Sequence, residues 1–175
     1  MSAGQLSKDL LGVIGLALLA MVCGLAVNRF GSHPIPLVYV SPDQQLQNDL
    51  SQLVNGPTPF DSFPVDTISL DQFRADVDDK SITILDARAA TYFNQGHVPR
   101  AMNLSRQDFA QDYMRMRPML ETLKDKPIVV YCAGGACHDS KMVAQALTAL
   151  GFSQVQIYPG GWDGWTAAGL PVVHS

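Results

Sequence analysis

The chain has 175 residues, enough for one ordinary domain and a short appendage. Its 12 lysine and arginine residues and 16 aspartate and glutamate residues give a formal net charge of -4, and no basic run occurs. We therefore expect no nucleic-acid partner. Three cysteines are too few for a disulfide framework: Cys23 lies in an apolar run, whereas Cys132 and Cys137 share one short segment.

An uncharged apolar run covers residues 10–27, from Leu10 to Val27. It reaches the length that spans a bilayer, roughly 17–25 residues, and exceeds a signal-peptide core of about 7–15 residues. We therefore predict a single-pass transmembrane anchor within residues 1–30. The alternative is a cleaved signal, because Gly24-Leu25-Ala26 offers a small-x-small site. Since the N-terminal tail is short, we expect the globular domain to be extracytoplasmic.

Residues 31–64 are rich in proline and are predicted to be an extended linker. Within them, Ser41-Pro42-Asp43 has the pattern of a helix start, and Asn55-Gly56-Pro57 has that of a stop. The helix between them would carry Leu46, Leu50 and Leu53 on one face. We expect this leucine face to pack on the domain; the alternative is a helix that binds a partner.

Residues 65–175 alternate between strand and helix patterns. The strand candidates are Thr67–Ser69, Ser81–Leu85, Ile128–Tyr131 and Val155–Tyr158. Apolar residues at helical spacing predict helices over 70–77, 89–94, 109–116 and 142–150, and a last one around Trp162 and Trp165. Pro118 should kink or end the third of these helices. This alternation predicts an α/β domain with a mostly parallel sheet, which binds ligands at the carboxyl ends of its strands.

Two of the candidate site residues, Asp86 and Cys132, follow strands at this edge. Cys132 leads into a loop with Gly134 and Gly135, and a helix follows that Asp139 or Ser140 can cap. Glycines let the loop turn its N–H groups inward as an anion nest, and a helix N-terminus adds a positive dipole end. Both effects favour the thiolate, so we predict a nucleophilic Cys132. The alternative is a buried structural cysteine.

With these residues in view, the stretch from about Val65 to Val173 resembles the rhodanese-like (sulfurtransferase) family. Four pieces carry the resemblance, in the order in which the family has them. They are Leu85-Asp86-Ala87-Arg88; Tyr92 with Gly96-His97-Val98-Pro99 and Ala101-Met102-Asn103-Leu104; Val129-Val130-Tyr131-Cys132; and Tyr158-Pro159-Gly160-Gly161-Trp162 with Trp165 and Gly169-Leu170-Pro171-Val172.

The resemblance implies sulfur transfer, with Cys132 as the catalytic nucleophile. Its thiolate would attack the outer sulfur of a donor such as thiosulfate or a persulfide. The resulting persulfide would then pass its sulfur to a thiol acceptor or to cyanide. The N–H groups of the substrate-binding loop would cradle it; the loop consists of Ala133, Gly134, Gly135, Ala136, Cys137 and His138. The resemblance implies no metal and no organic cofactor.

The loop departs from the family pattern, which often has a basic residue followed by serine late in the loop. Here Cys137 and His138 stand in those two positions, and no lysine or arginine lies between Cys132 and Ser140. The sequence thus indicates a weak affinity for thiosulfate or a different, persulfide donor. Arg100 also replaces a glycine common in the family, which we interpret as a tolerated surface change.

Other functions stay open. Cys132 and Cys137 can form a disulfide if their Cα atoms approach to about 4.4–6.8 Å, which would suit a thiol-disulfide redox protein. A phosphatase is disfavoured because the loop lacks an arginine, and a zinc site lacks a fourth ligand. Asp86 and Arg88 either line the site or hold neighbouring loops. A membrane-tethered binding module with an inert Cys132 is the non-catalytic alternative.

Overall fold

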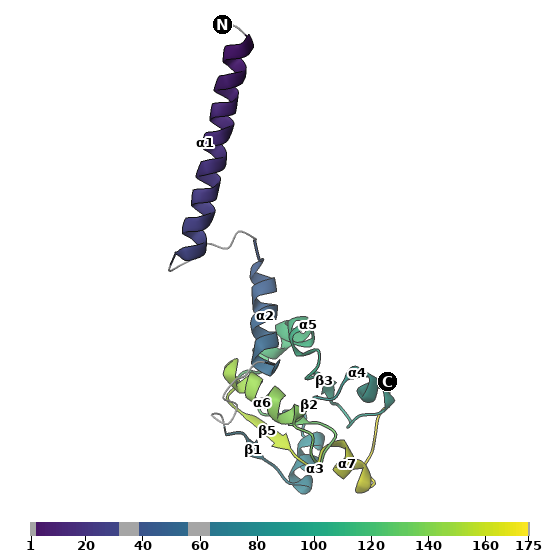
Figure 1. The fold of residues 1–175 in the computed structure, drawn as a ribbon. Coiled ribbons are helices and arrows are strands. Elements are labelled where there is room, and N and C mark those ends of the chain that lie inside the picture. Colours follow the sequence, from purple (N-terminus) through teal and green to yellow (C-terminus); the bar gives the residue numbers. More distant parts are fainter. Residues whose placement is uncertain (1–2, 32–38, 56–63, 175) are drawn as a thin grey trace. The chain divides into compact units, whose positions relative to one another are not determined.

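The computed structural model describes residues 3–31, 39–55 and 64–174, and the chain divides into two compact units, Met1–Ser41 and Pro42–Ser175. The first unit is built on helix α1 (Ala3–Phe30) (Figure 1). Within α1, the 21 residues from Leu10 to Phe30 form a stretch apolar enough to span a membrane, and none of them is buried. At about 1.5 Å per residue, this stretch covers roughly 30 Å, the thickness of the hydrocarbon core.

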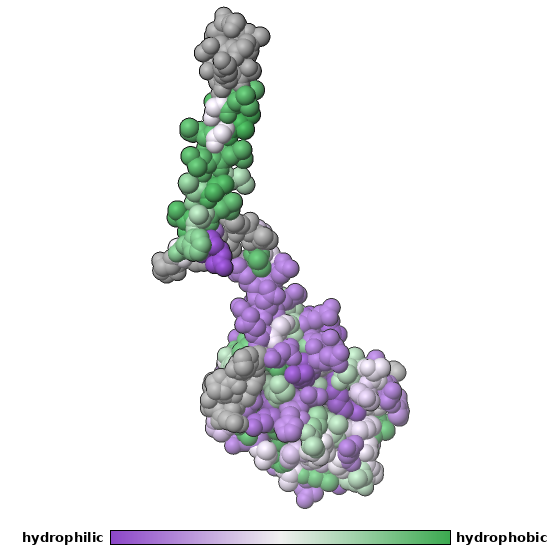
Figure 2. Space-filling view, viewed as in Figure 1, coloured by the Kyte–Doolittle hydropathy of each residue, from purple (hydrophilic) through white to green (hydrophobic). Residues whose placement is uncertain are grey.

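Figure 2 shows apolar side chains over most of the visible face of this helix. A helix with such a surface near the N-terminus occurs both as a membrane span and as a signal sequence. The proline-rich parts of the predicted linker, residues 32–38 and 56–63, lie outside the described residues. The linker and domain boundaries therefore stay predictions.

The second unit contains helix α2 (Pro42–Asn55), which begins where the Ser41-Pro42-Asp43 pattern placed it. Leu50 and Val54 are fully buried in a core that α2 shares with helices α5 and α6. This contact confirms that the leucine face packs on the domain. Of the predicted stop signal, Gly56 and Pro57 lie outside the described residues.

Five parallel strands form the sheet, in the order β1-β5-β4-β2-β3. Their bounds are β1 Asp66–Thr67, β2 Thr83–Asp86, β3 Met102–Asn103, β4 Ile128–Tyr131 and β5 Val155–Tyr158. Tyr131 pairs with Asp86 on one side and with Tyr158 on the other. Because the three central strands end level, the segments that follow them emerge side by side at one edge. The predicted parallel α/β class is confirmed.

Helices cover both faces of the sheet (Figure 1), and β4 is therefore buried on both sides. Ile128 and Val130 face the core shared with α2, α5 (Phe109–Leu120) and α6 (Asp139–Ala149), whereas Val129 and Tyr131 face the opposite core. The period-2 alternation of a strand produces this division. On the second face, helices α3 and α7 supply Phe73 and Trp165, both at most 2% exposed. Their bounds, with that of α4, are α3 Leu70–Asp78, α4 Ala90–Gln95 and α7 Gly161–Ala167.

Two local expectations need correction. Pro118 does not end helix α5, since the helix continues to Leu120 and passes into a 3₁₀ turn at Glu121–Leu123; a kink at Pro118 stays a prediction. A proline this close to the C-terminus removes only one hydrogen bond from the helix interior. Arg100 is more than a tolerated surface residue. It adopts a φ of 66°, and its guanidinium donates hydrogen bonds to three carbonyl groups, those of Val77, Asp79 and Ile82.

Candidate active site

Cys132 follows β4 directly, is 2% exposed, and begins the loop that precedes α6. The loop turns through two glycines in the left-handed region, Gly134 with φ 114° and Gly135 with φ 59°. A Cβ atom on Gly134 would collide with the carbonyl oxygen of Gly160. The loop can thus approach the β5–α7 turn closely only because position 134 has no side chain.

Backbone hydrogen bonds from the start of α7 hold the other side of the loop. The N–H of Trp162 donates to the carbonyl of Cys132 at 2.8 Å, and the N–H of Asp163 donates to Ala133 at 2.8 Å. Gly161, with φ 59°, allows this approach, because a Cβ atom there would collide with the backbone N of Gly134. The Gly160-Gly161-Trp162 segment therefore fixes the position of Cys132 from across the sheet edge.

Helix α6 starts at Asp139, and the prediction that Asp139 or Ser140 caps it is wrong. The N-cap residue is His138, whose side chain makes no capping hydrogen bond. Ser140, which we expected as a capping residue, is 4% exposed and donates its hydroxyl to Cys132 Sγ at 3.3 Å. The serine lies in the first turn of α6, so the hydroxyl and the N-terminal end of the helix both favour negative charge on that sulfur.

Cys132 and Cys137 form a disulfide in the structure, with their Cα atoms 6.5 Å apart. This distance lies within the range of ordinary disulfides, about 4.4–6.8 Å. The N–H of Cys137 donates to the carbonyl of Gly134 at 3.1 Å, which closes the loop into a turn. In this form that N–H group is directed at the loop's own backbone.

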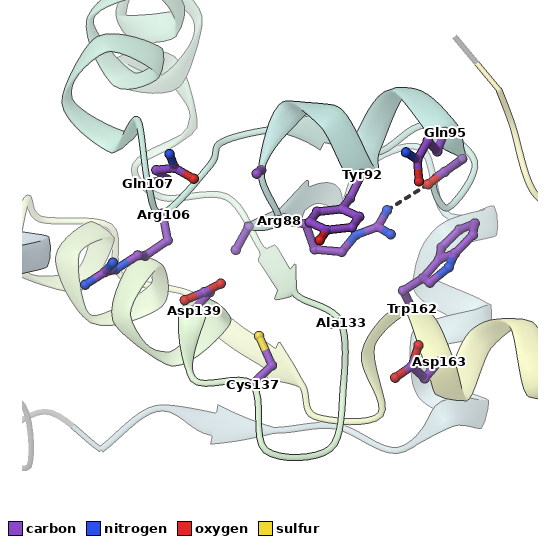
Figure 3. A pocket seen from close by; sticks show the side chains of 13 residues that line it. Arg88, Tyr92, Gln95, Arg106, Gln107, Ala133, Cys137, Asp139, Trp162 and Asp163 are labelled. Atoms are coloured by element: carbon purple, nitrogen blue, oxygen red, sulfur yellow. Dashed lines mark hydrogen bonds between the residues drawn. The ribbon is translucent and has the colours of Figure 1, made fainter.

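An open pocket of about 690 Å³ lies over the loop (Figure 3). Of the predicted site residues, Arg88, Ala133 and Cys137 line it. Ten further residues complete the wall: Ala87, Ala89, Tyr92, Gln95, Gly96, Arg106, Gln107, Asp139, Trp162 and Asp163. Six predicted site residues are not part of the wall: Asp86, Cys132, Gly134, Gly135, Ala136 and His138. Cys132 is thus joined to the pocket wall by its bond to Cys137.

Sequence reasoning missed Arg106 in the pocket wall. Its backbone N–H donates to the carbonyl of Ala87 at 3.0 Å, which places it beside the segment that follows β2. Its Nε is buried and has no hydrogen-bond partner among the described residues. In the view of Figure 3, Cys137 lies between Arg106 on the left and Trp162 on the right. In the sequence, Arg106 could have been suspected from its position two residues after the Ala101-Met102-Asn103-Leu104 piece.

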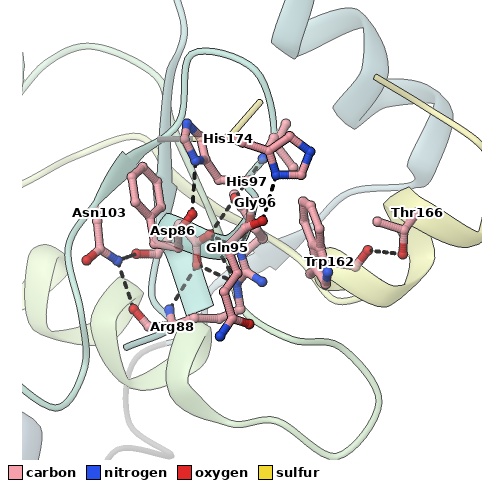
Figure 4. A network of polar contacts seen from close by, with 12 residues as sticks. Asp86, Arg88, Gln95, Gly96, His97, Asn103, Trp162, Thr166 and His174 are labelled. Atoms are coloured by element: carbon pink, nitrogen blue, oxygen red, sulfur yellow. Dashed lines mark hydrogen bonds and ion pairs between the residues drawn. The ribbon is translucent and has the colours of Figure 1, made fainter. Parts of the chain in front are cut away.

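Asp86 and Arg88 form a buried ion pair next to the pocket (Figure 4). Arg88 Nη2 lies 2.6 Å from Asp86 Oδ2, and Arg88 Nε donates to Oδ1 at 3.0 Å. Arg88 Nη2 also donates to the carbonyl of Gly96 at 2.8 Å, and the guanidinium lies over the Trp162 ring, 4.5 Å from its centroid. Arg88 thus lines the pocket and also joins neighbouring segments, whereas Asp86 joins these segments without lining the pocket.

Tyr131 completes this network from the end of β4. Its hydroxyl donates to Asp86 Oδ2 at 2.6 Å and accepts from the N–H of Val98 at 3.1 Å. Burial, and then the Asp86 carboxylate, raise the pKa of Tyr131, so the hydroxyl stays a donor at neutral pH. Burial works against the charged form of Arg88, but its hydrogen bond and charge contact with Asp86 prevail and raise the pKa of Arg88.

This is a parallel α/β protein with a cysteine loop at the carboxyl edge of its sheet. The rhodanese-like domain family model matches residues 69–168. Thiosulfate sulfurtransferase GlpE of Shewanella oneidensis is 33% identical over 101 residues, which cover 58% of this chain and 92% of the relative. A sulfurtransferase of Allochromatium vinosum is 32% identical over 111 residues, covering 62% and 92%.

Among solved structures, the solution structure of the rhodanese-like domain from the Alr3790 protein of Anabaena sp. superposes with a TM-score of 0.51. It is 28% identical, and the match covers 65% of this chain and 80% of that one. The chain therefore belongs to the rhodanese-like domain family, and the resemblance seen in its sequence is confirmed. Its curated relatives include sulfurtransferases, which supports a transferase function at the level of the family.

Proposed function

We propose that this chain is a sulfurtransferase that carries sulfur as a persulfide on Cys132. The observation that carries the proposal is the environment of Cys132 Sγ at the end of the central strand. The sulfur receives a hydrogen bond from Ser140 at 3.3 Å and adjoins the N-terminal turn of α6. Both contacts stabilise the thiolate that a nucleophilic cysteine requires.

In the proposed reaction, the Cys132 thiolate attacks the outer sulfur of thiosulfate. A bond forms between Cys132 Sγ and that sulfur, the sulfur–sulfur bond of thiosulfate breaks, and sulfite leaves with the electron pair. A thiol acceptor or cyanide then removes the outer sulfur and regenerates the thiolate. The loop from Ala133 to His138 surrounds the persulfide in this proposal, and its glycines leave room for it.

The donor is an anion, although the loop itself carries no lysine or arginine. Arg88 and Arg106 are arginines that line the pocket from outside the loop. Arg88 is already paired with Asp86, whereas the buried Nε of Arg106 has no hydrogen-bond partner within the described parts of the chain. We assign Arg106 the role of attracting thiosulfate or the anionic end of a persulfide donor to the pocket.

We also propose that α1 anchors the chain in a membrane through residues 10–27, with the catalytic domain outside the cytoplasm. The length and the apolar surface of the helix support the anchor, and the alternative is a cleaved signal. A disulfide between Cys132 and Cys137 would persist in such an oxidising compartment. A reporter enzyme fused after Ser175 tests the orientation, and activity restricted to the cytoplasm would contradict it.

Thiocyanate formation from thiosulfate and cyanide tests the sulfurtransferase proposal. The full chain in nonionic detergent is first reduced with a dithiol, which is then removed so that Cys132 is free. We expect sustained activity in Cys137→Ser, which cannot form the disulfide, and in Cys23→Ser/Cys137→Ser, and a loss of at least about a hundredfold when Cys132→Ser is added. Activity that survives in Cys132→Ser would overturn the assignment. If neither thiosulfate nor glutathione persulfide supplies sulfur to Cys137→Ser, the sulfurtransferase proposal is wrong.

A further inference from the structure

We infer that Cys137 is a resolving cysteine, which converts the persulfide on Cys132 into a disulfide and releases free sulfide. The inference rests on the proposed persulfide chemistry and adds a second activity to it: reduction of sulfane sulfur at the expense of a dithiol. It begins from the observed bond between Cys132 and Cys137. That bond shows that Cys137 Sγ reaches Cys132 Sγ, which is the inner sulfur of the persulfide.

The surrounding backbone holds both cysteines where this contact can form. Cys132 is fixed by the Trp162 N–H at 2.8 Å, and the turn between Gly134 and Cys137 is closed by a hydrogen bond of 3.1 Å. Their sequence separation is five residues and their Cα atoms lie 6.5 Å apart. A loop this short keeps the effective concentration of the second thiol high, because little chain entropy is lost when it closes.

Sulfide release in this proposal is a thiol–disulfide exchange at Cys132. The Cys137 thiolate attacks Cys132 Sγ, and the bond between the two cysteine sulfurs forms. The bond between Cys132 Sγ and the outer sulfur breaks, and the outer sulfur leaves with the electron pair as hydrosulfide. The two cysteines are oxidised by two electrons, and the sulfane sulfur is reduced by two. With thiosulfate as donor, one thiosulfate and two thiols give one disulfide, sulfite, hydrosulfide and a proton.

The exposure of the two sulfurs decides how the disulfide is reduced again. Cys132 is 2% exposed, whereas Cys137 lines the pocket. An external dithiol therefore meets Cys137 Sγ first, and its attack there expels Cys132 as the leaving thiolate. Ser140 donates a hydrogen bond to that leaving sulfur at 3.3 Å, which stabilises its negative charge. A more stable thiolate leaves faster, so the accessible sulfur is attacked and the stabilised sulfur departs.

A resolving role also explains why position 137 holds a cysteine where the family often has a basic residue. A cation there would bind the donor, whereas a thiol there consumes the product of the first step. The partner implied is a reducing dithiol, either a small molecule or a protein with a paired-cysteine site, that can enter the pocket over Cys137.

A single turnover without added thiol tests the inference, because an external thiol would itself release sulfide from a persulfide. The full chain in detergent carries Cys23→Ser, which removes the remaining thiol. It is reduced, freed of reductant without air, and mixed with thiosulfate; acid-quenched samples are then analysed for intact mass and for sulfide. We expect about one sulfide per chain, two fewer free thiols and no retained sulfur atom.

In the same background, Cys137→Ser should retain one sulfur atom and release at least about tenfold less sulfide. Cys132→Ser should neither gain sulfur nor release sulfide. If the chain with both cysteines keeps its persulfide and releases no sulfide, or forms the disulfide without sulfide, the inference is overturned while persulfide formation stands. If Cys137→Ser gains no sulfur from thiosulfate or glutathione persulfide, the proposed function fails and the inference falls with it.

Discussion

Removing Arg88 should destabilise the domain far more than removing Arg115 does, although both arginines hold a carboxylate at 2.6 Å. In the Arg88–Asp86 pair the side chains are 7% and 0% exposed; in the Arg115–Asp112 pair they are 65% and 15% exposed. Arg88→Gln leaves a buried carboxylate without its cation, which typically costs about 3–5 kcal/mol. Arg115→Gln breaks a solvent-screened pair and should cost about 0–1 kcal/mol.

We expect the lower end of that range for Arg88→Gln, about 3 kcal/mol, because Tyr131 and the Arg88 backbone N–H still donate to Asp86. With a urea m-value of about 1–3 kcal/mol/M, the unfolding midpoint then falls by about 1–3 M. Tryptophan fluorescence of the full chain in detergent reports on this domain alone, because both tryptophans lie in α7. A difference below about 1 kcal/mol between the two variants would refute the argument that burial strengthens the Arg88 pair.

Two further predictions concern the cysteine loop. Gly134→Ala should slow sulfite release from thiosulfate at least about tenfold, because the added Cβ atom meets backbone and displaces the reacting sulfur. Gly135→Ala, whose Cβ atom meets nothing within 4 Å, carries only the backbone cost of its φ of 59°, about 1–2 kcal/mol, and should lose clearly less of the rate than Gly134→Ala; equal losses would contradict this account. Ser140→Ala should raise the pH of half-maximal sulfite release by about one unit, since it loses a hydrogen bond to the Cys132 thiolate. The exposed Ser153→Ala is the control, and an unchanged profile in Ser140→Ala would exclude the serine from thiolate stabilisation.

Two structural parts at one edge of the sheet form the site: a buried polar network and the cysteine loop. The Asp86–Arg88–Tyr131 network is buried and fixes the segments after β2 and β4. The cysteine loop turns over this network, and its glycines make the contact with the start of α7 possible. A rigid base under a loop of small residues positions a nucleophile without restricting access to the pocket above it.

The sequence was sufficient for most of the elements and their order, but the two-residue strand β3 (Met102–Asn103) was not predicted. The buried run Ile128–Tyr131 and the helical spacing after it depend on local patterns, and these placed Cys132 correctly at the end of the central strand. The glycines at 134 and 135 also indicated a tightly turning loop, and in the structure both have a positive φ. Local steric and periodic rules act within a few residues, which is why they can be read from the chain itself.

Tertiary structure alone decided which distant groups meet at this edge. Arg106 enters the pocket wall because its backbone pairs with Ala87, and the Trp162 N–H holds Cys132 from thirty positions further along the chain. Ser140, readable as a helix cap, instead directs its hydroxyl at the cysteine sulfur. Sequence patterns specify which face of an element is buried, but the partner of a polar group follows from strand order and register. The site therefore exists only once β2, β4 and β5 end side by side.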